Sequence, residues 1–511
     1  KDSMKTKISF LRLFILLGII TVAGLLYFNI GHIVSKSVGK EKVKEKPWFA
    51  SYVDATLMPQ FDFENVEGNL VLSFVVASDK DNSPSWGNAY SLDEAETSLD
   101  LERRIARVRQ NNGDVVISFG GLINHELAQK YTAPKALMSA YESVVVRYAV
   151  NTIDLDLENE GLTDVAAGKV RAQAIAELQK KRKKASKPLA VWLTLPVSTD
   201  GLTSDGVNAV KILLDEDVEL AGVNGMTMNF GETHKPDLSM GKNAIRALKK
   251  LHAQLKKIYQ DKKIFLSDKA VWAKIGATPM IGQNDLSNEI FTLADAKTLN
   301  QFAQKSGLGR LSIWSANRDR ASTTSSVHTN VVSNFYSGVE QEDQAFSKIL
   351  KVGFEGNLLA NTKKETVSDL TEEDLIDHPK TSPYQIWSKD KTYLAETKVV
   401  WQHNVYQAKW WTRGDEPNVP LTNLDANPWV LLGPVLKGEK PVSIPVLKDG
   451  TYESWGNEKV YKAGDRVMGG SNGYVAKWWN QDETPEKAII NPNDSPWRPM
   501  TESEIMEVLK K

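Results

Sequence analysis

The sequence predicts an α/β fold, a (β/α)8 barrel of the TIM type followed by two small all-β modules. Two observations predict the barrel. Apolar runs of strand length recur over about 290 residues, and stretches with apolar residues at helical spacing separate them. Eight strands that alternate with helices suit a closed barrel better than an open doubly wound sheet. A third observation, a gapless internal repeat near the end of the chain, predicts the modules.

Residues 1–35 predict export from the cytoplasm. Basic residues precede an apolar run from Leu13 to Ile30, which is typical of a secretory signal. The run is close to the lower limit for crossing about 30 Å of hydrocarbon, and no clear cleavage site follows it. Cleavage and retention as a membrane anchor therefore both stay open. We expect an extracellular protein, secreted or anchored to the outer face of the cell membrane, that contacts membrane only through this segment.

The barrel domain is expected over residues 47–359. Its strands are expected, in chain order, at residues 48–56, 69–77, 114–120, 151–158, 189–197, 221–229, 270–275 and 310–315. Between them, segments such as 93–110 and 240–260 carry apolar residues at helical spacing among Lys, Arg and Glu. No glycine-rich phosphate-binding motif follows any of these strands, which argues against a nucleotide site.

The composition excludes further classes of function. The 511 residues carry 63 Lys and Arg against 64 Asp and Glu, with no basic stripe large enough for nucleic acid. Cysteine is absent, so the chain has no disulfide, no thiolate zinc site and no cysteine nucleophile. The 7 histidines are scattered without metal-ligand spacing. We therefore expect no metal, no cofactor and no nucleic-acid partner, and we expect a monomer.

Two copies of a small module are expected after a polar linker at residues 360–382. The copies span residues 383–435 and 450–500 and match at a constant offset of 68. The matched cores are Tyr406-Gln-Ala-Lys-Trp410-Trp411 and Tyr474-Val-Ala-Lys-Trp478-Trp479. Some of these aromatic residues must form the core of so small a domain. Because adjacent strand residues face opposite sides, we expect one tryptophan of each pair to be buried and the other exposed.

The candidate catalytic residues lie in the fourth predicted strand. Alternation along 151–158 places Asp154, Asp156 and Glu158 on one face, and the intervening Ile and Leu residues on the other. Three ionised carboxylates on one inward face would repel each other strongly, so at least one must hold a proton. The row ends at the C-terminal mouth of a barrel strand, where such barrels place their active sites.

These motifs resemble glycoside hydrolase family 18, the chitinases and their relatives. The residues that carry the resemblance are Asp154-x-Asp156-x-Glu158, Ser118-Phe-Gly120-Gly121, Met226-Thr-Met228-Asn229 and Trp314. The two modules resemble the chitin-binding modules of carbohydrate-binding family 5/12, through their A-K-W-W core. The resemblance implies that chitin or a related N-acetylglucosamine polysaccharide is the substrate.

The resemblance also implies a retaining, substrate-assisted mechanism without an enzyme nucleophile. Glu158 would protonate the glycosidic oxygen and later activate water. Asp156 would orient the 2-acetamido group of the substrate, and Asp154 would share a proton with Asp156. Trp314 would form the floor under the cleaved sugar. The matched serine, glycine, methionine and asparagine positions would line the substrate site.

The chain departs from the family pattern at three positions. Asn151 stands where the motif has its first Asp, and Asn229 where the sixth strand has an Asp. A tyrosine hydroxyl usually assists near that strand, where this chain has Met228 and Phe230. Two alternatives therefore remain, a chitin-binding lectin or adhesin with little or no catalysis, and an endo-β-N-acetylglucosaminidase. The twin modules favour a polysaccharide substrate over the second alternative.

Overall fold

The computed structural model describes residues 46–322, 331–358, 376–418, 426–442, 445–470, 472–490 and 494–510. The predicted export segment and most of the predicted linker lie outside the described residues. The chain divides into two compact units, residues 1–46 and residues 47–511, and everything below concerns the second. No helix in the described ranges is both long enough and apolar enough to span a bilayer.

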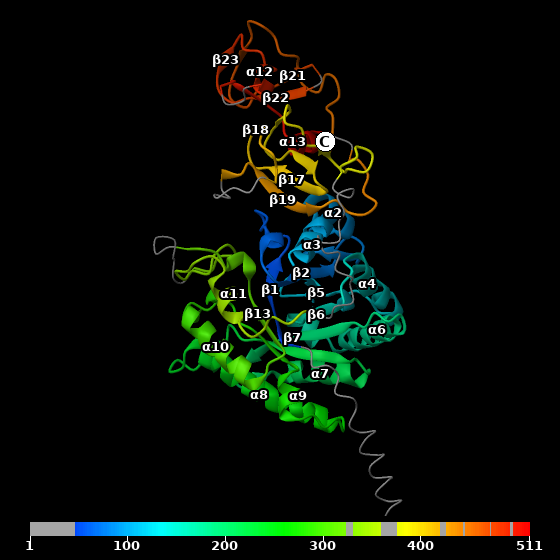
Figure 1. Ribbon diagram of the computed structural model, residues 1–511. Helices are drawn as coiled ribbons and strands as arrows, with labels where there is room; N and C mark the ends of the chain where they lie inside the picture. Colours follow the sequence, from blue (N-terminus) through cyan, green and yellow to red (C-terminus); the bar gives the residue numbers. More distant parts are fainter. Residues whose placement is uncertain are drawn as a thin grey trace, which may run out of the picture. The chain divides into compact units, whose positions relative to one another are not determined.

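Eight parallel strands form a closed barrel, as predicted (Figure 1). They are β1 (Trp48–Asp54), β2 (Asn69–Ala77), β5 (Val115–Gly120), β6 (Thr152–Asp156), β7 (Ala190–Ser198), β9 (Leu220–Met226), β10 (Ile275–Thr278) and β13 (Arg310–Ile313). Their order is β1-β13-β10-β9-β7-β6-β5-β2, and pairing of β1 with β2 closes the ring. The shorter strands at its edges and loops are β3 (Pro84–Trp86), β4 (Tyr90–Ser91), β8 (Gly201–Leu202), β11 (Gly282–Gln283) and β12 (Ile290–Phe291).

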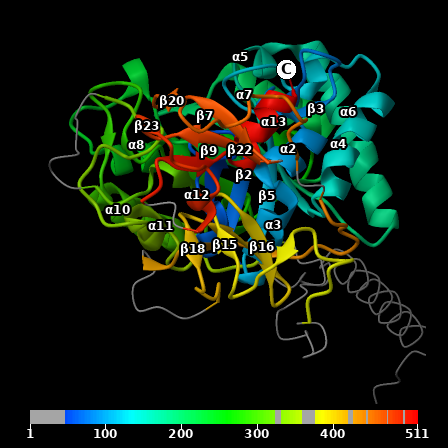
Figure 2. The ribbon, with the colours of Figure 1, turned by 90° about the horizontal axis from the view of Figure 1, so that it is seen from above.

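Helices cover the outside of the barrel (Figures 1 and 2). They are α2 (Leu92–Leu99), α3 (Leu101–Gln110), α4 (Pro134–Arg147), α5 (Asn159–Thr163), α6 (Val165–Lys184), α7 (Ser204–Asp215), α8 (Met240–Asp261), α9 (Asp268–Trp272), α10 (Leu293–Ser306) and α11 (Ala345–Leu350). Many begin at a polar cap, such as Ser239, whose hydroxyl accepts from the backbone of α8. Their apolar faces pack on the outward strand residues in one continuous core.

The predicted seventh strand is wrong. Residues 268–272 form helix α9, capped by Ser267, and the strand β10 starts only at Ile275. Its sequence, Ile-Gly-Ala-Thr, has glycine and alanine at the two central positions, and both residues are depleted in strands. Small residues are needed there, because a Cβ atom at Gly276 would lie 2.8 Å from the side chain of Asn224. The predicted fourth and sixth strands also end early, at Asp156 and Met226.

The C-terminal region forms small separate sheets that follow the repeat. The strands are β14 (Gln385–Ile386), β15 (Thr392–Tyr393), β16 (Lys398–Trp401), β17 (Asn404–Ala408), β18 (Thr412–Arg413) and β19 (Trp429–Pro434), then β20 (Val460–Tyr461), β21 (Arg466–Gly469), β22 (Asn472–Ala476), β23 (Asn480–Gln481) and β24 (Trp497–Pro499). Strands β15 to β18 return as β20 to β23 at the predicted offset of 68. Helices α12 (Lys487–Ile490) and α13 (Glu502–Leu509) accompany the second copy. Below, the described residues of 383–435 are called the first module and those of 450–500 the second module.

Each module is built on a buried tyrosine and tryptophan pair. Tyr393 and Trp429 meet edge to face at 5.3 Å in the first module, and Tyr461 and Trp497 do so at 4.9 Å in the second. Both tryptophan indoles donate to a backbone carbonyl oxygen, at 2.9 and 2.7 Å. These residues match at the repeat offset of 68, with Pro-Trp at both positions, but the repeat alone does not predict their place in the core.

The expected division of each Trp-Trp pair into one buried and one exposed residue is wrong. In the second module, Trp478 and Trp479 are 46% and 60% exposed. In the first, Trp410 is 44% exposed and Trp411 is half-buried. Both pairs lie in the bend that follows β17 or β22. Strand alternation therefore does not determine which side these tryptophans face.

The tyrosines of the two repeat cores are core residues rather than surface residues. Tyr406 and Tyr474 are 6% and 0% exposed and pack with the buried tryptophans. They lie on strands β17 and β22, where alternation does apply.

The first module packs against helix α3 of the barrel. Arg103 of α3 is buried and donates to the Pro434 carbonyl oxygen at 2.7 Å and to the Glu439 carboxylate. Lys398 of the module pairs with Asp100 at 3.2 Å. Burying a charge is costly unless it is paired, so these pairs depend on the module staying in place.

Candidate active site

Strand β6 carries the predicted row of carboxylates. Asp154 and Asp156 are buried, and the alternating residues Ile153 and Leu155 join the apolar core. Glu158 lies two residues beyond the end of β6, where it is half-buried and precedes helix α5. The row therefore runs from the barrel interior to the C-terminal mouth, as its spacing predicts.

Asp154, the deepest of the three, is surrounded by hydrogen-bond donors. One carboxylate oxygen accepts from Tyr52 Oη and Ser118 Oγ, each at 2.8 Å. The other accepts from Thr194 Oγ1 at 2.6 Å and from Arg310 Nη1 at 2.7 Å. The donors come from strands β1, β5, β7 and β13, so only the closed barrel brings them together.

Arg310 is a buried cation in the middle of the barrel. Its guanidinium also donates to Tyr52 Oη at 2.9 Å and to Ser312 Oγ at 3.0 Å. The ring centroids of Trp48 and Trp192 lie 5.1 and 5.5 Å from it, within cation–π range. No sequence motif predicts this place for Arg310, because a lone arginine at a strand start belongs to no motif. Its only sequence signal is a charge at an otherwise apolar strand.

Burial raises the pKa of both Asp156 and Glu158, and different neighbouring charges add to the shift of each. Burial, and then the charges of Glu158 and Asp154, raise the pKa of Asp156 well above its usual range, while Arg310 acts in the opposite direction. Burial, and then the charge of Asp285, raise the pKa of Glu158 to about 7. A carboxylic acid with a pKa near the working pH suits general acid–base catalysis.

The expected sharing of a proton between Asp154 and Asp156 is not what the geometry favours. Four donors already occupy the two oxygens of Asp154. The Oδ1 atom of Asp156 is buried and has no hydrogen-bond partner among the described residues.

Asp285 is a further carboxylate of the site, and no sequence motif predicts it. Asn229 donates to its Oδ2 atom at 2.6 Å and accepts from its backbone N–H at 3.0 Å. Asn284 accepts from the Asn229 backbone at 3.2 Å and is itself anchored to the carbonyl oxygen of Met280. Asn229 thus positions a carboxylate instead of supplying one. Asp285 lies in the segment that follows the C-terminal end of β10, just after β11. Because the sequence predicts the seventh strand too early in the chain, it does not predict Asp285 near the mouth of the barrel.

The glycines of Ser118-Phe-Gly120-Gly121 allow close packing beside the acidic row. Gly120 has φ +105°, and a Cβ atom there would lie 2.1 Å from the carbonyl oxygen of Asp156. Gly121 has φ +87°, and its Cβ atom would lie 2.8 Å from the ring of Phe74. Side chains at these positions are therefore excluded by both conformation and space.

Aromatic and apolar residues surround the mouth. Trp314 follows β13, is half-buried and stacks on Phe74, with ring centroids 5.7 Å apart. Tyr52 lies 6.0 Å from Trp314 and links this surface to Asp154. Met226 ends β9 and Met228 follows it, and both are half-buried.

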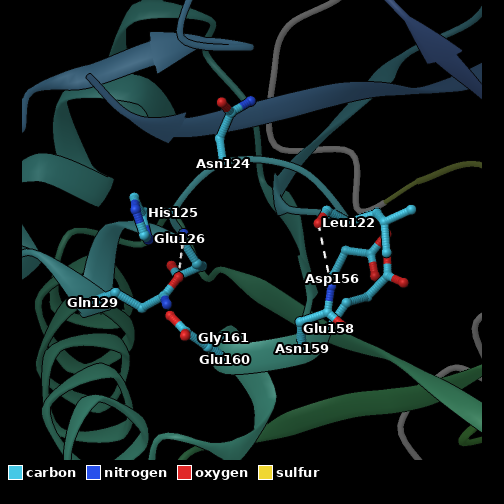
Figure 3. Close-up of a pocket in the computed structure, with 11 residues that line it drawn as sticks. Leu122, Asn124, His125, Glu126, Gln129, Asp156, Glu158, Asn159, Glu160 and Gly161 are labelled. Atoms are coloured by element: carbon cyan, nitrogen blue, oxygen red, sulfur yellow. Dashed lines mark hydrogen bonds between the residues drawn. The ribbon is translucent and has the colours of Figure 1, made fainter. Parts of the chain in front are cut away.

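A cavity of about 280 Å³ opens next to Glu158. Figure 3 shows Asp156 and Glu158 on one side of it and Glu126 and Gln129 on the other. Glu126 is buried and accepts from Arg171 at 2.8 and 3.0 Å, so it is a fixed part of the wall. Among the described residues, no group of three or more His, Cys, Asp or Glu side chains is arranged to hold a metal ion.

The curated proteins that are similar to this chain include the following two. One is the probable bifunctional chitinase/lysozyme of Escherichia coli strain K12, 36% identical over 298 residues. The other is endochitinase 11 of Metarhizium anisopliae, 36% identical over 297 residues. Each match covers 55% of this chain, and it spans 32% and 55% of the length of the two relatives respectively. No family model matches the chain.

Solved structures show the same barrel. The catalytic domain of a hyperthermophilic chitinase from Pyrococcus furiosus is 27% identical, with a TM-score of 0.51. Catalytic-site mutants of active domain 2 of a chitinase from Pyrococcus furiosus give 27% identity and a TM-score of 0.52. Each match covers 61% of this chain and 98% of the solved chain.

Replacing Asp285 with Asn should lower the pKa of Glu158 from about 7, because the charge of Asp285 contributes to raising it. The titration of Glu158 can be followed by pH-dependent infrared difference spectra, with Glu158→Gln protein as the reference. Asp261→Asn, at the end of α8, is the matched control and should leave the titration unchanged. An unchanged or raised pKa of Glu158 in Asp285→Asn would contradict the assigned cause.

Proposed function

We propose that the barrel is a glycoside hydrolase of family 18 that cleaves the β-1,4 linkages between N-acetylglucosamine units of chitin. The observation that carries the proposal is the row of Asp154, Asp156 and Glu158, which ends in a carboxylic acid with a pKa of about 7. Similarity to proteins named as chitinases, over 55% to 61% of the chain, supports chitin as the substrate.

In the first step, Glu158 donates its proton to the glycosidic oxygen as the bond to the anomeric carbon breaks. The bonding electrons leave with that oxygen. The carbonyl oxygen of the substrate's own 2-acetamido group forms a bond to the anomeric carbon, which gives a cyclic oxazolinium ion. No side chain acts as the nucleophile.

In the second step, water attacks the anomeric carbon and the bond to the acetamido oxygen breaks. Glu158, now a carboxylate, takes a proton from that water and is restored to its starting form. Two inversions at one carbon give overall retention.

The groups next to Glu158 orient the substrate. Asp156 accepts the acetamido N–H and offsets the positive charge of the oxazolinium ion. Trp314, supported by Phe74, offers a flat apolar face to the sugar ring. Burial, and then the charge of Asp285, which Asn229 holds in place, raise the pKa of Glu158 to about 7 and so favour a protonated Glu158 before substrate binds.

The two modules supply binding to insoluble polymer. Trp410, Trp478 and Trp479 expose aromatic surface of the kind that packs on pyranose rings. With two modules on one chain, the second contact becomes intramolecular and can raise apparent affinity by about 10² to 10⁴. We further propose that the protein acts outside the cell as a monomer, either secreted or held at the membrane by its N-terminal segment.

Glu158→Gln should lower kcat on chito-oligosaccharides by roughly 10²-fold or more, because the amide cannot donate or accept the catalytic proton. The fold and the affinity for substrate should be kept, since Gln has nearly the same shape. Glu142→Gln, on the outer helix α4, is the matched control and should be as active as wild type. Activity of Glu158→Gln near that of the control would rule out Glu158 as the general acid.

The product of a β-linked substrate should appear first as the β-anomer, because the acetamido route inverts the anomeric carbon twice. A proton NMR time course over the first minutes separates the anomers before they equilibrate. Cellulose, which lacks the acetamido group, should resist cleavage even if the modules retain it. Early release of the α-anomer, or cleavage of cellulose, would exclude the mechanism.

Removing residues 445–511 should weaken retention on insoluble chitin and leave kcat/KM on soluble oligomers within about twofold, since avidity from the second module is lost. A pull-down on chitin beads and an oligomer assay measure the two effects. Removing residues 383–511 should in addition lower the melting temperature, because Arg103 loses Pro434 and Glu439 as partners and Asp100 loses Lys398. Equal loss of oligomer hydrolysis in the shorter truncation would contradict the modular division.

A further inference from the structure

The ion pair between Arg310 and Asp154 has no part in the two chemical steps described above. It lies at the centre of the barrel, with both side chains fully buried and 2.7 Å between Nη1 and Oδ1. We propose that Arg310 is a positioning residue that holds Asp154 as a permanent carboxylate and so confines the exchangeable proton of the row to Asp156 and Glu158. The inference rests on the proposed function, because that proton is the one Glu158 donates.

The donors around Asp154 have fixed directions. Arg310 has no acceptor atoms, so its Nη1 must donate to Asp154. Tyr52 Oη accepts from Arg310 Nη2 at 2.9 Å, which leaves its own proton for Asp154. Thr194 Oγ1 accepts from Asn224 Nδ2 at 3.0 Å and in turn has its proton free for Asp154. A proton on Asp154 would point at a donor and break one of these bonds.

Asp156 offers the opposite environment. Its Oδ1 is buried without a hydrogen-bond partner among the described residues, so a proton can reside there without displacing a donor. The charged groups that act on it are Glu158 and Asp154, which favour the neutral acid, and Arg310, which opposes it. The net effect of these groups and of burial is a raised pKa of Asp156. The proton therefore resides on Asp156, which is next to Glu158 in the row, and not on Asp154.

Asn151 directly precedes β6 and lies outside the acidic row, with its side chain bonded to the outer helix α6. It is an amide and has no titratable proton, and its Oδ1 accepts from Arg182 Nη2 at 2.8 Å. Below Asp156 the row thus contains one carboxylate, Asp154, which is tied to a cation. With Asp154 held as a carboxylate and no titratable group at Asn151, only Asp156 and Glu158 exchange the proton.

The first test is a double-mutant cycle of Arg310→Met and Asp154→Asn, read as kcat/KM on a soluble chito-oligosaccharide. Each single variant leaves one buried charge without its partner and should lower kcat/KM by at least about tenfold. The double variant has neither charge, and it should recover at least about tenfold over the poorer single variant. Arg310→Lys retains the cation and should stay closer to wild type than Arg310→Met does.

If Asp154 instead had to accept and return a proton, its amide variant would be inactive in any background. A double variant no better than Asp154→Asn would therefore overturn the proposal. The pair of Arg104 and Glu64 is the matched control, since it is also buried, at 2.8 Å, outside the acidic row. Its variants Arg104→Met and Glu64→Gln should change the melting temperature without changing the effect of Asp154→Asn.

The second test needs no turnover and so separates failure of this inference from failure of the proposed function. Infrared spectra near pH 6, in a Glu158→Gln background, should show the carbonyl band of a protonated aspartic acid. Asp156→Asn should remove the band, and Asp154→Asn should retain it. Loss of the band with Asp154→Asn and its survival with Asp156→Asn would place the proton on Asp154 and overturn the inference, whatever the activity.

Discussion

The barrel is organised around one buried ion pair, Asp154 with Arg310. Removing two charges from water costs several kcal/mol per ion unless hydrogen bonds compensate. Here three further barrel strands contribute hydrogen-bond donors to Asp154, through Tyr52, Ser118 and Thr194. The pair therefore requires the closed ring, and the closed ring in turn fixes where Asp156 and Glu158 lie. Closure of the barrel therefore both pairs the buried charges at its centre and positions the catalytic carboxyl groups at its mouth.

The sequence predicts the frame of the barrel well, because periodic burial is a local property of the chain. Alternation alone orients Asp154 and Asp156 correctly, and the repeat offset of 68 predicts equivalent strands in both modules. The sequence does not predict the places of Arg310 and Asp285 in the site. Both depend on contacts between segments that are distant along the chain, Arg310 with Asp154 and Asp285 with Asn229. The glycine- and alanine-rich β10 was misplaced for a related reason: its small residues are required by the neighbouring Asn224 rather than by strand propensity.

The two modules show where a sequence repeat stops being informative. Their cores are equivalent, with the same tyrosine and tryptophan contact and the same indole hydrogen bond. Their surroundings differ, because Lys398 of the first module pairs with Asp100, and Glu439, just after that module, pairs with Arg103 of α3. Such pairs are specified by the barrel and not by the module. One copy of the repeat has thereby become part of the catalytic domain's surface.

The order of Asp154 and Arg310 along the chain bears on how the protein can be made. They are 156 residues apart, and the carboxylate comes first. A chain that emerges N-terminus first, from a ribosome or from a translocation channel, exposes β6 long before β13 exists. Until Arg310 arrives, an early sheet can bury Asp154 only by giving it a proton or leaving its charge unpaired. The last barrel strand thus completes the fold, because it supplies the cation that pairs with Asp154. Without that cation, the earlier strands cannot bury an ionised Asp154 at low cost.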